Sequence, residues 1–199
     1  MILPNSSGGA TTEQVGYFEI ESAAFAEWLS REFESRWKIR HGLVGSLAEA
    51  VVALEVSPVL TRYLCVPIGS WTVLLGNGPL GTDVGLLPSR AAREFGCRAL
   101  RAVVADDSNM YPARILEVFG PAGDSPLAFE RSIAAANDGG RWAFETFGTP
   151  YPFEEESAYT RRTKASRFTA EMVYDYLRGL GVPLDSPPDW GNALMVERS

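Results

Sequence analysis

The sequence predicts an α+β fold: a single domain with a mainly antiparallel sheet of about six strands and helices packed on one face. Apolar, β-branched runs alternate with turn residues in the middle of the chain, and helical patterns lie towards its two ends. No change of composition divides the 199 residues, of which 46% are hydrophobic and 22% charged. We therefore expect a flexible segment at residues 1–12, one domain at 13–185 and a proline-bounded tail at 186–199.

The first part of the chain predicts a strand and two helices. Residues 1–12 are small and polar, and burial of such residues cannot offset the entropy lost on ordering them. A short strand is expected at 16–20. Ser46 with Glu49 has the spacing of a capping box and predicts a helix over 46–54, although the alternating apolar residues there would also suit a strand. Between them, large apolar residues recur at helical spacing and predict a core-facing helix: Phe25, Trp28, Leu29, Phe33 and Trp37.

The middle of the chain predicts strands around one helix. Two apolar runs, 62–68 and 71–75, are divided by Gly69. A helix at 88–95 is indicated by Pro88 at its start and by Gly96 just past its end. Two further hairpins are then expected, one pairing 99–105 with 113–119 and one pairing 131–136 with 141–147.

The last part predicts two helices and an appended tail. Glu154, Glu155 and Glu156 begin a segment that ends in basic residues near 161–164, an order that the helix dipole favours. Thr169 caps a second helix that ends at Gly181. Beyond 186, Trp190 and Leu194 are expected to dock on the domain as an appendage.

Charge narrows the classes of partner. The net charge is -7 and the isoelectric point about 4.8, whereas a nucleic-acid surface requires clustered lysine and arginine. Lys38 and Lys164 are the only lysines, a bias that indicates a GC-rich bacterial genome. The acidic charge therefore predicts no nucleic-acid partner. The two cysteines lack the paired spacing of a disulfide framework, and no apolar run is long enough to span a membrane, so we expect a cytoplasmic protein that does not bind membrane.

One motif could bind a nucleotide. Residues 76–81 match G-x-G-x-x-G after an apolar run, and Asn77, Gly78, Gly81 and Asp83 would then contact a phosphate-bearing ligand. Pro79 removes a backbone amide, however, and Pro88 begins the next helix well beyond Gly81. These features favour a structural turn.

Other catalytic or metal-binding patterns are missing from the sequence. His41 has no nucleophile in a recognisable turn, and runs of consecutive acids point their side chains apart, so we expect no metal and no cofactor. Asp106, Asp107, Glu154, Glu155 and Glu156 are expected to lie in solvent, at a hairpin tip and at a helix start. Trp142, after a tight turn, is a further candidate contact residue.

Two functions from different classes fit these observations. The first is a non-enzymatic, acidic protein-binding module, such as an immunity protein or antitoxin that neutralises a basic partner; the exposed acids and Trp142 would form its contact surface. The second is a small-molecule or nucleotide-binding enzyme that uses the loop from Gly76 to Asp83. A surface map distinguishes them, because the first requires an acidic face and the second a deep pocket.

Overall fold

The computed structural model describes residues 2–6, 9–32, 37–57 and 60–198. In these parts the strands are β1 (Gln14–Phe18), β2 (Trp37–His41), β3 (Thr61–Ile68), β4 (Trp71–Gly76), β5 (Ala99–Ala105), β6 (Ala113–Asp124), β7 (Phe129–Asn137), β8 (Trp142–Phe147) and β9 (Leu194–Arg198). The α-helices are α1 (Ala10–Glu13), α2 (Ser22–Glu32), α3 (Leu47–Ala53), α4 (Leu87–Phe95) and α5 (Ala170–Gly179). Short 3₁₀ turns are η1 (Glu156–Thr160), η2 (Lys164–Ser166) and η3 (Trp190–Asn192).

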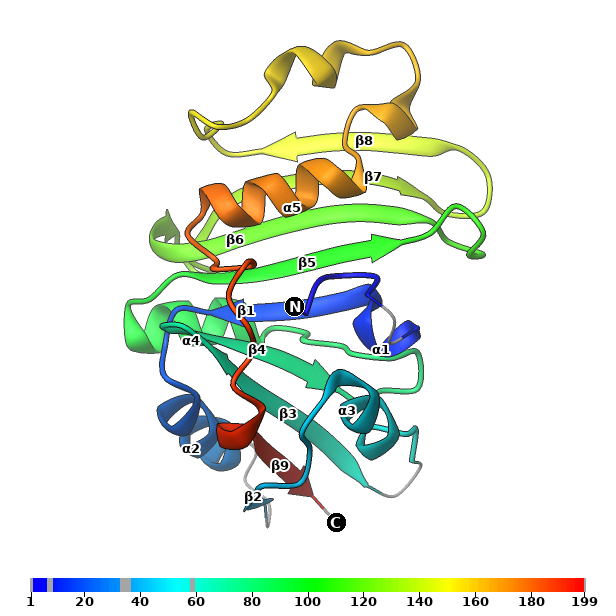
Figure 1. The fold of residues 1–199 in the computed structure, drawn as a ribbon. Helices are drawn as coiled ribbons and strands as arrows, with labels where there is room; N and C mark the ends of the chain where they lie inside the picture. Colours follow the sequence, from blue (N-terminus) through cyan, green and yellow to red (C-terminus); the bar gives the residue numbers. More distant parts are fainter. Residues whose placement is uncertain (1, 7–8, 33–36, 58–59, 199) are drawn as a thin grey trace.

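The strands form one antiparallel sheet in the order β2-β9-β3-β4-β1-β5-β6-β7-β8 (Figure 1). The α+β class is confirmed, but the described residues contain nine strands where about six were expected. Two of the additional strands, β2 and β9, are short and pair with each other. Their sequences lack the long β-branched runs that predicted the other strands.

Helices cover both faces of the sheet, so the expectation of one covered face is wrong. The helices α3 and α5 lie in front of the sheet in Figure 1, and α2 and α4 lie behind it. The larger core contains Leu177 of α5 and Ala50 of α3, and a separate core contains Trp28 of α2 and Ala91 of α4. Every residue of β4 is buried, as expected for a central strand covered on both sides.

The predicted helix ends are confirmed where they depend on local chemistry. The Ser46 hydroxyl accepts a hydrogen bond from the Glu49 N–H at 3.2 Å, and Thr169 accepts one from the Met172 N–H at 3.3 Å. Gly96 ends α4 in the left-handed conformation, at a φ of 61°. Phe25, Trp28 and Leu29 are buried along α2; Trp37 lies in β2 instead, and Phe33 lies outside the described residues.

Residues near both ends of the chain take part in the core. Ile2 is fully buried, and its carbonyl accepts a hydrogen bond from the Tyr17 hydroxyl. The segment expected to be an appended tail supplies β9, which pairs with β2 on one side and β3 on the other. Residues 154–164 form no α-helix, and η1 and η2 occupy that region instead. No helix of the described residues is long and apolar enough to cross a bilayer.

The hairpins bring several turns to one end of the sheet. The end of β5 lies beside the start of β1, because Val103 pairs with Gln14. The β5–β6 hairpin is confirmed, and so is the β7–β8 hairpin around 138–141. The loop after β4 reaches the same end, since β4 runs antiparallel to β1. This end lies on the right of Figure 1.

Candidate functional site

Direct contacts hold these turns together around α1. The side-chain amide of Asn109 donates to Glu13 at 2.8 Å, and that of Asn5 donates to Asp106 at 2.7 Å. Gly81 lies so close to α1 that a Cβ atom built on it would come within 2.0 Å of the Ala10 carbonyl oxygen. The turns therefore form one continuous surface, which we call the acidic end.

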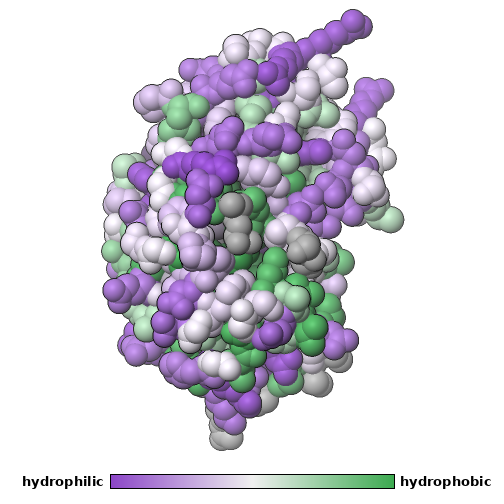
Figure 2. Space-filling view, in the orientation of Figure 1, coloured by the Kyte–Doolittle hydropathy of each residue, from purple (hydrophilic) through white to green (hydrophobic). Residues whose placement is uncertain are grey.

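The acidic end is defined by carboxylates from separate segments of the chain. They are Glu13, Asp83, Asp106, Asp107 and Asp138. All are exposed except Glu13, which is half-buried. Asp107 is neutralised in part by Arg114, at 2.7 Å. Figure 2 shows mainly hydrophilic side chains along the right margin at the level of these hairpins. Carboxylates gathered at one end of a sheet favour a negative potential there, and such a potential attracts a basic surface.

Large apolar side chains are exposed among these acids. Leu80 is 91% exposed, Met110 76% and Tyr111 60%. Tyr111 also lies beside the neighbouring hairpin, because a Cβ atom on Gly139 would be 3.6 Å from its ring. Aromatic and methionine side chains with a polar rim are typical of protein–protein contact surfaces.

Trp142 lies behind the acidic surface. The Arg114 guanidinium carbon is 5.1 Å from the centre of the Trp142 ring, and the same guanidinium reaches Asp107. The indole is half-buried and packs against the larger core. Trp142 thus positions Arg114 and Asp107, a role that alternation along β8 did not reveal.

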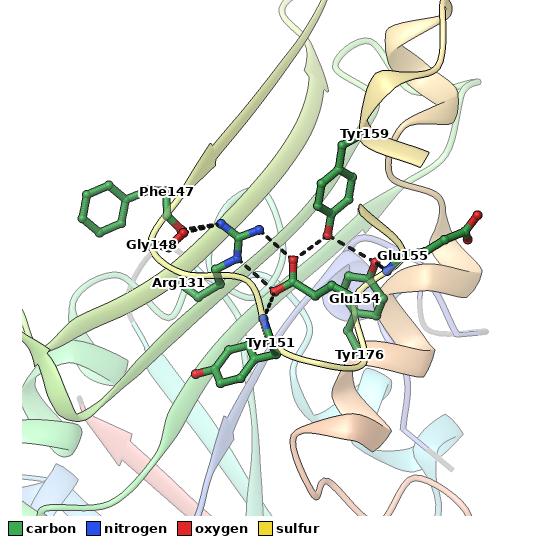
Figure 3. Close-up of polar contacts among 8 residues, drawn as sticks. All are labelled: Arg131, Phe147, Gly148, Tyr151, Glu154, Glu155, Tyr159 and Tyr176. Carbon is green, nitrogen blue, oxygen red and sulfur yellow. Dashed lines mark hydrogen bonds and ion pairs between the residues drawn. The ribbon is translucent and has the colours of Figure 1, made fainter. Parts of the chain in front are cut away.

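Glu154 is buried, which contradicts the expectation that it lies in solvent. Its side chain is 1% exposed and that of Arg131 3%, with Arg131 Nη2 2.7 Å from Glu154 Oε2 (Figure 3). The Tyr159 hydroxyl and the Tyr151 N–H also donate to this carboxylate, at 2.7 and 3.0 Å. The hydroxyl of Tyr176 lies 3.2 Å from that of Tyr159 and accepts the Glu155 N–H.

These contacts settle the charge states. Burial alone would raise the pKa of Glu154, but the hydrogen bonds from Arg131, Tyr151 and Tyr159 outweigh burial and hold that pKa below its ordinary value. Burial and the hydrogen bonds to Tyr176 and Glu154 raise the pKa of Tyr159, which remains a donor. The buried carboxylate is therefore ionised and paired with Arg131, and its role here is structural.

Glu155 and Glu156 are exposed, but far from the acidic end. Arg161 pairs with Glu155 at 2.8 Å. Both glutamates follow the end of β8 that is opposite to the acidic end, and the six residues of β8 span about 20 Å. The structure thus brings Asp83, Asp106, Asp107 and Trp142 to one end of the sheet and leaves this glutamate run at the other.

The loop at 76–81 is a turn in which several polar groups bond within the protein. Asn77 is buried, and its side-chain oxygen accepts the Arg62 N–H at 2.7 Å. The N–H of Gly76 donates to the Thr82 hydroxyl, and the N–H of Gly81 donates to the Gly78 carbonyl. The φ of 94° at position 81 and the closeness of this residue to α1 both require glycine. The spacing of glycines therefore has a structural explanation, and α4 begins well beyond the loop.

The remaining candidates form no catalytic arrangement. His41 ends β2, and Cys65 is fully buried, which raises the pKa of its thiol. Within the ranges that the structure describes, no group of three His, Cys, Asp or Glu side chains could hold a metal ion. Comparison with models of known families, with curated proteins and with solved structures finds no match to this chain.

Proposed function

We propose that the chain is a protein-binding module that holds a basic partner protein at the acidic end, in the manner of an immunity protein or antitoxin. The observation that carries the proposal is the presence of exposed Leu80, Met110 and Tyr111 among carboxylates from separate segments. The acids speed encounter with a positive surface, and the apolar side chains supply contact area once the two proteins have met.

The shape of the surface supports the same proposal. The acidic end is built from turns and the short helix α1 at one end of the sheet, and hydrogen bonds through Asn5 and Asn109 link these segments. A surface that is already ordered loses little entropy when a partner binds. The nucleotide-binding alternative gains no comparable support, because the Asn77 side chain and the N–H groups of Gly76, Asn77 and Gly81 bond within the protein.

The partner can be identified by cross-linking from the proposed surface. A photoreactive amino acid at Met110, which is 76% exposed, should yield a cross-linked protein of high isoelectric point in extracts of the source cell. The same amino acid at Val52 of α3, which is 74% exposed, is the matched control. Equal labelling from both positions would indicate non-specific contact and contradict the proposal.

Purified partner then tests the apolar contacts. Tyr111→Ala and Met110→Ala should each raise the dissociation rate about fivefold or more, because contact residues of this type commonly cost over 1 kcal/mol when truncated. Val52→Ala should leave that rate unchanged. If both variants dissociate at the same rate as the unsubstituted protein, the acidic end does not bind the partner.

A further inference from the structure

A hollow lies at the end of β7 and β8 that is opposite to the acidic end. It has a volume of about 320 Å³ and is lined by Asp124, Phe129, Glu130, Phe147, Thr149 and Tyr151, among others. Phe147 ends β8, about 20 Å along that strand from the acidic end. In Figure 3 the Phe147 ring and the Tyr151 hydroxyl both point away from the buried Arg131–Glu154 pair.

Glu130 supplies a fixed negative charge to this hollow. The Tyr151 hydroxyl donates to its Oε2 at 2.9 Å, and the Ala122 N–H donates to its Oε1 at 3.2 Å. Burial and the hydrogen bond to Glu130 raise the pKa of Tyr151 to about 12, so the hydroxyl keeps its proton. In the described structure no arginine or lysine forms an ion pair with Glu130. Arg98, whose positive charge acts to lower the pKa of Tyr151, donates a hydrogen bond to the Leu180 carbonyl.

Glycines hold the carboxylate and its loop in close contact. A Cβ atom on Gly120 would lie 2.2 Å from Glu130 Oε1, and one on Gly148 would lie 2.0 Å from the Glu130 carbonyl oxygen. Gly148 also has a φ of 80°, which other residues rarely adopt. The half-buried carboxylate is therefore fixed before any ligand arrives, which lowers the entropy lost on binding.

An aromatic face lies beside this carboxylate. Phe147 stacks on Phe129, with ring centres 5.3 Å apart and an angle of 26° between the ring planes. Phe147 is 48% exposed. A cation over such a ring is attracted by the negative charge of the ring face, and a planar guanidinium can stack on it while its N–H groups reach a carboxylate. Asp124, which is exposed, adds a second carboxylate to the hollow.

We propose that this hollow binds an alkylguanidinium group, with the guanidinium stacked on Phe147 and hydrogen-bonded to Glu130. The group belongs either to an arginine side chain of a protein or to a free small guanidine. The inference does not depend on the acidic end, because it concerns a different site and can be tested without the partner. The alkyl stem would lie along the Phe129–Phe147 pair, which leaves the planar head at the carboxylates.

Titration with butylguanidinium, followed by amide NMR, tests the proposal. Saturable shifts are expected at Ala122, Phe147 and Thr149, with a dissociation constant on the order of 1 mM for one charged contact and one stacked ring. Butylammonium should bind more weakly, because it cannot stack, and neutral butylurea should not bind. Equal shifts with butylurea, or none with butylguanidinium, would overturn the proposal.

Substitutions locate the probe. Glu130→Gln keeps an acceptor for Tyr151 but removes the charge, and should weaken binding about tenfold or more. Phe147→Leu removes the ring from an exposed position, where loss of fold is not expected, and should weaken binding severalfold. Glu145→Gln, which alters an exposed carboxylate of the neighbouring strand β8, is the control and should bind normally. Normal binding by both Glu130→Gln and Phe147→Leu would contradict the assignment.

A peptide with a single arginine separates the two sources. Tighter binding of acetyl-Gly-Arg-Gly-amide than of butylguanidinium would assign the hollow to an arginine of a protein. Tighter binding of the free guanidine would assign it to a small molecule. In either case Glu130→Gln must weaken the interaction, since both ligands present the same group. Failure of this titration would leave the cross-linking result at the acidic end unaffected.

Discussion

The Arg131–Glu154 pair shows how one residue can mislead a reading of sequence. Three consecutive glutamates look like a solvated helix start, yet Glu154 is buried while Glu155 and Glu156 are exposed. Its partner Arg131 lies in β7, so no local pattern connects the two. Charge runs are usually solvated, and only the fold shows which member of a run is buried.

Glu154→Gln should lower the free energy of unfolding by about 3 kcal/mol, because it leaves the Arg131 charge buried without its counter-ion. Urea denaturation at neutral pH measures the loss. Glu155→Gln breaks an exposed pair with Arg161 and is the matched control, with an expected change of about 1 kcal/mol or less. Equal losses in the two variants would contradict the burial of this pair.

The same pair predicts how stability depends on pH. The pKa of Glu154 is lower in the folded protein than its ordinary value of 4.5, so the stabilisation is complete above that value. It is lost as the pH falls below 4.5 and through the folded-state pKa. The difference in unfolding free energy between the unsubstituted protein and Glu154→Gln should therefore shrink in acid, as urea denaturation at a series of pH values would show. A constant difference down to pH 3, roughly 1.5 units below the ordinary value, would contradict the assignment.

At the scale of the element, short-range chemistry could be predicted and long-range pairing could not. Caps at Ser46, Gly96 and Thr169, and the turn between β7 and β8, depend on neighbouring residues and lie where the sequence places them. β9 depends on partners far away in the chain, since it lies between β2 and β3. Its five residues carry no turn or cap that marks them as a strand within the sheet.

Val196→Asp tests the place of β9. Val196 is fully buried and pairs with Ile39 and Tyr63, so a carboxylate there would lose its hydration without gaining a partner. We expect a loss of about 3 kcal/mol or more, measured by thermal or urea unfolding. Arg198→Ala, at an exposed position of the same strand, should change stability little. A small effect of Val196→Asp would indicate that this segment is an appendage.

The loop at 76–81 gives a second prediction at this scale. Gly81→Ala should destabilise the protein by about 1 to 3 kcal/mol, because alanine is strained at a φ of 94° and would clash with the Ala10 carbonyl. Gly140→Ala, where a Cβ atom has room, is the control, and thermal unfolding measures both variants.

In thermal unfolding, NAD or ATP should not raise the melting temperature of the unsubstituted protein. A saturable rise lost in Gly78→Val would favour the nucleotide-binding function.

At the scale of the whole molecule, the candidate site is a property of the fold rather than of a motif. Asp83 and Asp106 were separate candidates for different functions in the sequence, and antiparallel pairing around β1 brings both to one end. The exposed Leu80, Met110 and Tyr111 carried no signal of their own, because exposure of apolar residues in turns cannot be read from composition. Asp106 and Asp107 could be named in advance as acidic contact residues, but Glu13, Asp138 and the surface that these acids form could not.

The rate of association with the basic partner, measured by stopped flow at low and at physiological salt, tests the acidic end most directly. We expect Asp106→Lys/Asp107→Lys, checked for its fold by circular dichroism, to slow association more than about tenfold at low salt and to weaken the salt dependence. Glu155→Lys/Glu156→Lys makes the same change of charge in the segment that follows the opposite end of β8. At physiological salt, where screening acts beyond about 8 Å, it should leave the rate nearly unchanged. Equal rates for the unsubstituted protein and Asp106→Lys/Asp107→Lys at both salt concentrations would contradict capture at the acidic end.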